Sequence, residues 1–498
     1  MDSELTGTSE LAPFAALEGR PFAARGSGRL TRRPYSAAPE AHSPSAYRKG
    51  AGGALWRHVD ATHVIIASLL IALSIIGGFR VALLLSELAA HSSGVHALQG
   101  HNDFLAFYSG AHYVLAGRAG DIYSATALAS YQLTLVPHSV GSAGYMPFLN
   151  PPFAAVMQSP LALMSEPVAR LVWFAINALL ALAIAFWITS SLPARQRALA
   201  CVMIVGTFPF YQALVQGQWS VILLLGCLGA LHFARRGSYI ASGACLSVLW
   251  LKPQLALIVL PGLLIFRYRR IALGMAGAAC LVALASLPVT GVQPYIDYVP
   301  FLLNVSLDHV NSAGALEPAV WRGDLSLTQG LNGLFVGLFS QSSSVVVNAL
   351  TFLSVGATLL LFRRAALRTR PAFGHVTNEM MLVASVCLVL LIDPHLFAQD
   401  ITLLFVVVPI LTPHVKHPFA MVLGLCLLTD APLIDQAVPL HLFTLALWCA
   451  TAVICLAVVR ERVHENNRAV SEEDRTREEG QRRQPLLEPA TALPSAAR

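Results

Sequence analysis

The chain carries a series of long apolar blocks almost free of charge, and this feature limits its fold more than any other. A helix that crosses the ~30 Å hydrocarbon core of a bilayer needs about 20 mostly apolar residues. Seven blocks have roughly that length: 64–86, 169–192, 198–216, 218–234, 270–290, 344–362 and 436–459. Only 12% of the 498 residues are charged, and the mean hydropathy is +0.62. The sequence therefore excludes a soluble globular enzyme and predicts an all-α polytopic membrane protein.

Five shorter apolar blocks complete the predicted topology, at 239–251, 254–267, 378–392, 399–412 and 417–430. If each block crosses once and the N-terminus is cytoplasmic, about twelve transmembrane helices result and six basic clusters face the cytoplasm. These clusters are Arg195/Arg197, Arg235/Arg236, Arg267/Arg269/Arg270, Arg363/Arg364/Arg368/Arg370, Lys416/His417 and Arg460/Arg462. The count requires a turn at Lys252-Pro253, because a single helix over 239–267 would move every later cluster to the outer side.

The acidic residues have the opposite distribution. Of the thirteen Asp and Glu residues between positions 64 and 459, this topology places twelve outside, and Glu379 is the exception. We therefore expect the chemistry on the outer side, where two long segments lie at 87–168 and 291–343. In the first, the stretches that begin at Asp103 and Asp121 predict interfacial helices, and 151–164 predicts a re-entrant or interfacial segment.

The two ends of the chain differ from the membrane domain, which we expect to span 61–460. Residues 1–60 and 461–498 are polar, without an apolar period, and predict disordered cytoplasmic segments. The block 64–86 follows basic residues and has no small-residue cleavage site, so we interpret it as an uncleaved signal anchor.

The net charge of +6 does not indicate a nucleic-acid partner, because the basic residues follow the membrane topology and form no basic face with interleaved aromatics. All eight cysteines occur singly in apolar blocks, without a CxxC pair. We therefore expect neither a metal nor another cofactor.

Several polar residues at or near membrane depth are candidates for the site, because such groups need a wet cavity or a partner. Asp103 suits a general base, although Asn102 or Asp103 could equally cap a helix. Gln216 and Gln218 suit sugar hydroxyls, or else a polar tight turn. Asn150 precedes a proline pair and forms either a rim of the site or a simple turn.

The cationic candidates are Lys252, Arg80 and His395. Lys252 is one of three lysines in the chain, and its ammonium calls for a phosphate or for an ion pair with an outer aspartate. Arg80 requires a carboxylate or a phosphate, or extends to the headgroups. His395 lies between Asp393 and Asp400, and a histidine with flanking carboxylates can serve acid–base chemistry, contact phosphate or bind a metal, although this spacing fits no strong metal motif.

An ordered series of weak motifs resembles glycosyltransferase family 87, a family of membrane mannosyltransferases within the GT-C superfamily. The series runs over about residues 60–450 and consists of DFxxFYxxA from Asp103, GRxxxxIY from Gly117, NPPF from Asn150, SPLAL from Ser159, GQW from Gly217, LKPQLAL from Leu251 and DPH from Asp393. Family members often have a tyrosine before the paired prolines, where this chain has Asn150, so the sugar and acceptor specificity stays open.

The resemblance implies a GT-C fold, a polyprenyl-phosphate sugar as donor and a catalytic carboxylate in the first outer loop, which corresponds to Asp103. It also implies donor-phosphate contacts from Lys252 and His395, and we add Arg80 as a further phosphate ligand. We expect substrate contacts from six residues: Tyr108, Asn150, Gln216, Gln218, Gln254 and Asp400.

The predicted activity is transfer of a hexose, with mannose favoured by the resemblance alone, to a lipid or glycan hydroxyl. We expect inversion at the anomeric carbon, with Asp103 as base, in a bacterial inner membrane with the site facing the periplasm or exterior. The alternative is a secondary transporter or a flippase for lipid-linked sugars. A ligase or polymerase of the GT-C type is a third interpretation, although such enzymes usually have their main outer loop late in the chain.

Overall fold

The computed structural model describes residues 80, 103–135, 146–306, 328–339, 344–367, 376–437 and 440–460, all within the unit His63–Arg498. The predicted disordered segments 1–60 and 461–498 lie outside these residues, as do the predicted signal anchor except for Arg80 and much of the outer segment 291–343. Within the described residues every regular element is a helix and none is a strand, which confirms the all-α prediction for this part of the chain.

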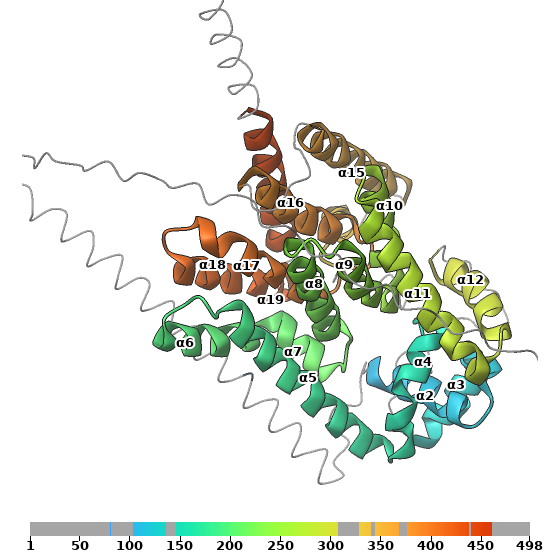
Figure 1. Ribbon diagram of the computed structural model, residues 1–498. Coiled ribbons are helices and arrows are strands. Elements are labelled where there is room, and N and C mark those ends of the chain that lie inside the picture. Colours follow the sequence, from blue (N-terminus) through green and yellow to red (C-terminus); the bar gives the residue numbers. More distant parts are fainter. Residues whose placement is uncertain are drawn as a thin grey trace, which may run out of the picture. The chain divides into compact units, whose positions relative to one another are not determined.

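The helices follow one another along the chain (Figure 1). They are α2 (Asp103–Leu115), η1 (Ala119–Asp121), α3 (Ala125–Leu135), α4 (Pro152–Gln158), η2 (Ser159–Leu163), α5 (Glu166–Ile188), α6 (Ala194–Val205), α7 (Phe208–Val215), α8 (Ser220–Arg235), α9 (Tyr239–Leu246), η3 (Ser247–Leu251), α10 (Pro253–Ile265), α11 (Arg269–Thr290), α12 (Gln293–Ser306), α14 (Leu331–Leu338), α15 (Ser344–Ala366), α16 (Val376–Ile392), η4 (Ala398–Val406), α17 (Val407–Leu411), η5 (Thr412–His414), α18 (Pro418–Asp430) and α19 (Pro432–Ala437), where η denotes a 3-10 helix. A last helix spans Leu442–Arg460.

Five of these helices are long and apolar enough to cross a membrane, and the bent pair α6–α7, with an angle of 55°, makes a sixth. The five are Glu166–Ile188, Arg269–Thr290, Val345–Ala366, Pro418–Asp435 and Leu442–Arg460. Shorter apolar helices occupy the other predicted blocks after position 216. The chain is therefore consistent with a multi-pass membrane protein, while the count of twelve crossings stays a prediction.

Glycines allow the neighbouring helices α8, α9 and α11 to pack closely; all three are labelled in Figure 1. A Cβ added to Gly226 of α8 would lie 2.8 Å from the carbonyl oxygen of Cys245 in α9. One added to Gly274 would lie 2.2 Å from the carbonyl oxygen of Ile240. Small residues at these positions bring the helix backbones together, as at many helix contacts in membranes.

The directions of α9 and α11 follow from their contacts at both ends. Near its start, α9 meets the first turns of α11 through Ile240 and Gly274. The 3-10 helix η3 continues α9, and the carbonyl of its last residue, Leu251, accepts a hydrogen bond from Asn150 Nδ2 at 2.6 Å. The chain just beyond α11 reaches the same place, since Tyr298 Oη donates to the Leu149 carbonyl at 3.1 Å. The two helices therefore run in the same direction.

Helix α10 follows α9 and η3 in the chain and precedes α11. Because α9 and α11 run in the same direction, α10 must run in the opposite direction. The reversal lies at Lys252, which separates η3 from α10, and Pro253 is the first residue of α10. Proline suits this position because the first helical residue has no intrahelical partner for its N–H. The helix break thus occurs where the sequence predicted a turn.

The two ends of α8 meet different groups of residues. Its first residue, Ser220, lies beside Asp400, and we call this end of the bundle, with Asp103, Asp393 and Asp400, the acidic end. Its last residue, Arg235, binds Glu379, and we call this the basic end. The ends of α10 and α15 also meet there, through rings of Phe266 and Phe362 with centroids 5.2 Å apart. Arg235 and Ser220 thus mark the two ends of α8, while the predicted alternation of inner and outer loops stays a prediction.

The segment 151–164 begins and ends at the acidic end. Asn150 contacts Leu251 just before it, and at its end the Met164 carbonyl accepts a hydrogen bond from Tyr108 Oη at 2.8 Å. Helix α2 packs against α3, α4, α5 and η2, and ten of its thirteen residues are buried. An interfacial helix keeps one face on lipid, so the enclosure of α2 differs from the predicted interfacial position.

Candidate active site

A tight turn between α7 and α8 is clamped by two other helices. Gly217 has φ +66°, and an added Cβ would lie 2.8 Å from Cβ of Phe104. The Phe104 backbone N–H donates to the Gln216 carbonyl at 3.0 Å. Trp173 Nε1 of α5 donates to the Gly217 carbonyl at 2.7 Å. Only glycine combines this left-handed backbone with so close an approach.

The clamped turn presents Gln218 to Asp103. Gln218 Nε2 donates a hydrogen bond to Asp103 Oδ2, and the Gln218 side chain is buried. Asp103 is partly exposed and begins α2. The positive end of a helix dipole favours negative charge at this position. The structure therefore unites two of the predicted site residues and holds the carboxylate in place.

A second group at the acidic end surrounds Lys252. Its Nζ lies 2.5 Å from Asp400 Oδ1, which also accepts a hydrogen bond from Ser220 Oγ at 2.8 Å. Lys252 is 8% exposed and Asp400 is fully buried. The ion pair to an outer aspartate, one of the two partners considered for Lys252, is thus present in this structure.

The two groups are joined by three consecutive residues. Gln218 contacts Asp103, and Ser220 contacts the partner of Lys252. Between them, Trp219 is buried, with its ring 5.1 Å from that of Trp173 in an edge-to-face arrangement. The predicted base and the predicted phosphate-binding lysine therefore lie at one end of α8.

Asp393 and His395 occupy the turn between α16 and η4. Asp393 Oδ1 accepts a hydrogen bond from the His395 backbone N–H at 3.0 Å. Burial, with the Asp400 carboxylate nearby, raises the pKa of Asp393 to about 7. His395 is partly exposed. The turn thus adds a carboxyl that can change its charge near neutral pH.

Two further predicted residues, Asn150 and Gln254, lie near the helix break at Lys252. The Asn150 side chain donates a hydrogen bond through Nδ2 to the Leu251 backbone carbonyl. The backbone carbonyl of Asn150 accepts a hydrogen bond from Tyr123 Oη at 2.8 Å. Gln254 is partly exposed in the first turn of α10. Asn150 therefore links the chain before the paired prolines to the helix break.

Arg80 has partners of its own at the break between α6 and α7. Its guanidinium donates to the Gly206 carbonyl at 2.8 Å and to Asp430 Oδ1 at 3.0 Å. The same oxygen accepts the Phe208 backbone N–H at 2.6 Å. No hydrogen bond or ion pair among the described residues joins Arg80 to Lys252. The predicted carboxylate partner is present, but Arg80 is not brought to the Lys252 group.

Tyr108 and Gln216 also have structural contacts. The Tyr108 hydroxyl binds the Met164 carbonyl, and Gln216 Nε2 binds Gln212 Oε1 at 3.1 Å. Each contact ties α2 or α7 to its immediate surroundings. The structure does not bring either side chain to Asp103 through a hydrogen bond among the described residues.

The acidic end contains buried polar atoms that lack a partner within the described part of the chain. They are Gln218 Oε1, Trp219 Nε1, Asp393 Oδ2 and Asp400 Oδ2. Buried polar atoms are normally paired with protein, water or ligand. Among the residues the structure describes, no three His, Cys, Asp or Glu side chains form a group that could hold a metal. The unpaired atoms at the acidic end can hydrogen-bond to water or to a bound ligand.

Residues 148–394 match the model of glycosyltransferase family 87. Over these residues the chain belongs to that family. Membership indicates a glycosyltransferase, which requires a sugar donor and an acceptor. The matched segment includes Gln218, Lys252 and Asp393, whereas Asp103 precedes it. No significant match was found among curated proteins or among solved structures.

Sequence reasoning included Gly217 only as part of the GQW motif, and it did not select Ser220 or Trp173. Ser220 directly follows the GQW motif and begins α8, so its position was a detectable signal. The role of Trp173 depends on the approach of α5 to the turn, which nothing in the local sequence shows. The family 87 chain thus positions its candidate base through residues that carry no chemistry themselves.

Proposed function

We propose that this family 87 protein transfers a hexose, mannose in the first instance, from a polyprenyl-phosphate donor to a hydroxyl of a lipid or glycan. The basic end faces the cytoplasm, as the distribution of Arg and Lys favours, and the acidic end faces the opposite side. The donor's polyprenyl tail stays in the membrane, and its sugar phosphate reaches the acidic end.

One observation carries this proposal: Gln218 and Ser220, two residues apart, connect Asp103 to the Lys252–Asp400 pair. A partly exposed carboxylate and a cation at the same end of the bundle match the two needs of the reaction. The carboxylate serves the acceptor, and the cation serves the leaving phosphate.

The reaction is a direct displacement. The Asp103 carboxylate accepts the proton of the acceptor hydroxyl while the acceptor oxygen attacks C1 of the sugar. The bond between C1 and the phosphate oxygen breaks, and its electron pair leaves with the polyprenyl phosphate. A single displacement inverts the anomeric carbon. General base catalysis contributes about 10²- to 10⁴-fold in rate.

The Lys252 group supports the leaving phosphate. An ammonium has three N–H groups, and the hydrogen bond to Asp400 uses one of them. Two ionised carboxylates beside the lysine would repel a phosphate. The raised pKa of Asp393 reduces this repulsion, because a neutral Asp393 leaves Asp400 as the single negative partner of Lys252. His395, in the same turn, is a second candidate contact for the phosphate.

The proposal is tested with purified, reconstituted protein, a panel of radiolabelled polyprenyl-phosphate sugars and native lipid extract, followed by identification of the product. We expect labelled product from at least one donor and a loss of about 10²-fold or more in Asp103→Asn. Asp121→Asn is the matched control, because Asp121 is a partly exposed aspartate paired with Arg118. Folded protein without turnover of any lipid-linked donor would contradict the proposal, as would an Asp103→Asn variant with normal rates.

A further inference from the structure

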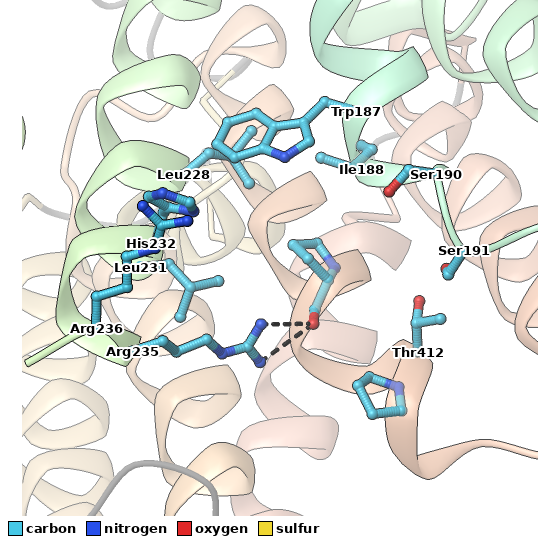
Figure 2. Close-up of a pocket in the computed structure, with 12 residues that line it drawn as sticks. Trp187, Ile188, Ser190, Ser191, Leu228, Leu231, His232, Arg235, Arg236 and Thr412 are labelled. Carbon is cyan, nitrogen blue, oxygen red and sulfur yellow. Dashed lines mark hydrogen bonds between the residues drawn. The ribbon is translucent and has the colours of Figure 1, made fainter.

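A pocket of about 440 Å³ lies at the basic end, far along α8 from the candidate active site. It is formed by the C-terminal ends of α5 and α8 and by the segment from Pro409 to Pro413 (Figure 2). The glycosyl-transfer chemistry proposed above does not use it. A ligand of this pocket would therefore be distinct from the donor and the acceptor.

The walls of the pocket divide into an apolar and a polar part. Trp187 and Leu228 belong to the apolar part, and the Trp187 ring lies 6.1 Å from the ring of His232, edge to face. The hydroxyls of Ser190 and Thr412 belong to the polar part; in Figure 2 they lie on the right, across from Leu228. A ligand for this pocket should itself combine apolar and polar groups.

The charged residues of the pocket are all basic. Arg235 is held in place by Glu379, whose two oxygens lie 3.0 and 2.9 Å from its Nη2, and by the Pro409 carbonyl at 3.2 Å (Figure 2). The adjacent Arg236 is exposed and makes no ion pair among the residues that the structure describes. None of the twelve lining residues is acidic. The pocket therefore favours an anion.

An exposed apolar face of α5 leads to this pocket. Leu179, Leu182 and Phe186 are 69%, 49% and 57% exposed, and Trp187 at the pocket is 41% exposed. The first three are spaced three and four residues apart, so they share one side of the helix. Acyl chains can lie along this side while their headgroup enters the pocket, an option that a free phosphate ion does not have.

We propose that this pocket binds the phosphate-bearing headgroup of an anionic phospholipid. Arg236, which makes no ion pair among the described residues, supplies the positive charge and contacts the phosphate together with the hydroxyls of Ser190 and Thr412. Arg235, whose charge Glu379 offsets, shapes the wall of the pocket, and Trp187 packs against the glycerol and upper acyl carbons. Basic pockets between helices on the cytoplasmic side of membranes suit such headgroups. This places a structural lipid at the end of the bundle opposite the donor.

The test measures lipid binding to the full chain in detergent by native mass spectrometry. Phosphatidylglycerol, phosphatidylcholine and inorganic phosphate are titrated separately. We expect a saturable phosphatidylglycerol adduct, weaker binding of phosphatidylcholine and no comparable adduct with inorganic phosphate. Arg236→Gln should weaken phosphatidylglycerol binding about five- to tenfold.

Arg269→Gln is the matched control, because Arg269 is an exposed arginine of the basic end that does not line the pocket. It should bind phosphatidylglycerol as the unmodified chain does. Melting temperatures without added lipid show that both variants are folded. Equal weakening by the two substitutions would indicate general charge attraction and overturn the proposal. Equal binding of the two lipids, or equally strong binding of inorganic phosphate, would overturn it as well.

Discussion

Lys252 and Asp400 form an ion pair in which the ammonium nitrogen lies 2.5 Å from a fully buried carboxylate oxygen. The two residues are 148 positions apart, so the pair joins the start of α10 to η4. Ser220 binds the same oxygen and adds α8 to this junction. The ion pair is therefore both a part of the candidate site and a contact among three helices.

Lys252→Met should destabilise the protein, because it leaves the Asp400 carboxylate buried without its cation. Breaking one partner of a buried pair typically costs about 3–5 kcal/mol. The double variant Lys252→Met/Asp400→Asn removes the remaining charge and should recover part of this loss. Thermal unfolding of the single and double variants provides the measurement. If the double variant were no more stable than Lys252→Met, the unpaired Asp400 carboxylate would not be the cause of the lost stability.

Gly217→Ala should lower both stability and glycosyl transfer. A residue other than glycine at φ +66° is strained by roughly 1–2 kcal/mol, and the new Cβ would also meet Phe104 at 2.8 Å. Gly237→Ala is the control, since Gly237 has φ +74° but no atom within 4 Å of an added Cβ. Only Gly217→Ala should impair transfer in protein that remains folded. Equal transfer by the two variants would argue against the turn as the support of Asp103.

Asp393→Asn should raise stability above pH 7 and have a smaller effect at pH 5. Burial raises the pKa of Asp393 from its ordinary value of 3.8 to about 7 in the folded protein, so the folded state binds the proton more tightly than the unfolded state. The stability linked to this proton is fully present below pH 4 and is lost as pH rises to about 7. Each unit of pKa corresponds to about 1.4 kcal/mol.

The measurement for Asp393 is the melting temperature of both proteins between pH 5 and 8. Asparagine keeps an oxygen that can accept the His395 N–H, so the turn should persist. The difference in melting temperature should grow in favour of Asp393→Asn as pH rises. A difference that is constant over this range would show that Asp393 does not titrate there.

Arg80→Met should destabilise the break between α6 and α7, because Asp430 then keeps the Phe208 N–H as its remaining hydrogen-bond donor in the described residues. Arg80→Met/Asp430→Asn should recover part of the stability. If Arg80 serves this junction and does not contact the donor, the double variant should keep the KM for the donor within about twofold. A large rise in the KM for the donor would instead support the original prediction that Arg80 contacts the donor phosphate.

Much of the fold follows from local patterns. The length of each apolar block predicts a helix, and the helices α5, α11 and α15 lie within a few residues of predicted blocks. The break at Lys252-Pro253 was predictable because proline removes a backbone donor. The enclosure of α2 was not, because it depends on neighbours that are distant in the sequence.

The candidate site divides in the same way. The residue types in DFxxFY, GQW and LKPQ already indicated a carboxylate, amides and an ammonium at one side of the membrane. Which carboxylate pairs with which cation required the tertiary structure: Asp400 pairs with Lys252, and Asp430 pairs with Arg80. The spacing of residues in the sequence shows which side chains share one face of a single helix. The ion-pair partners of Lys252 and Arg80 lie over a hundred residues away, so they are determined by how the helices pack.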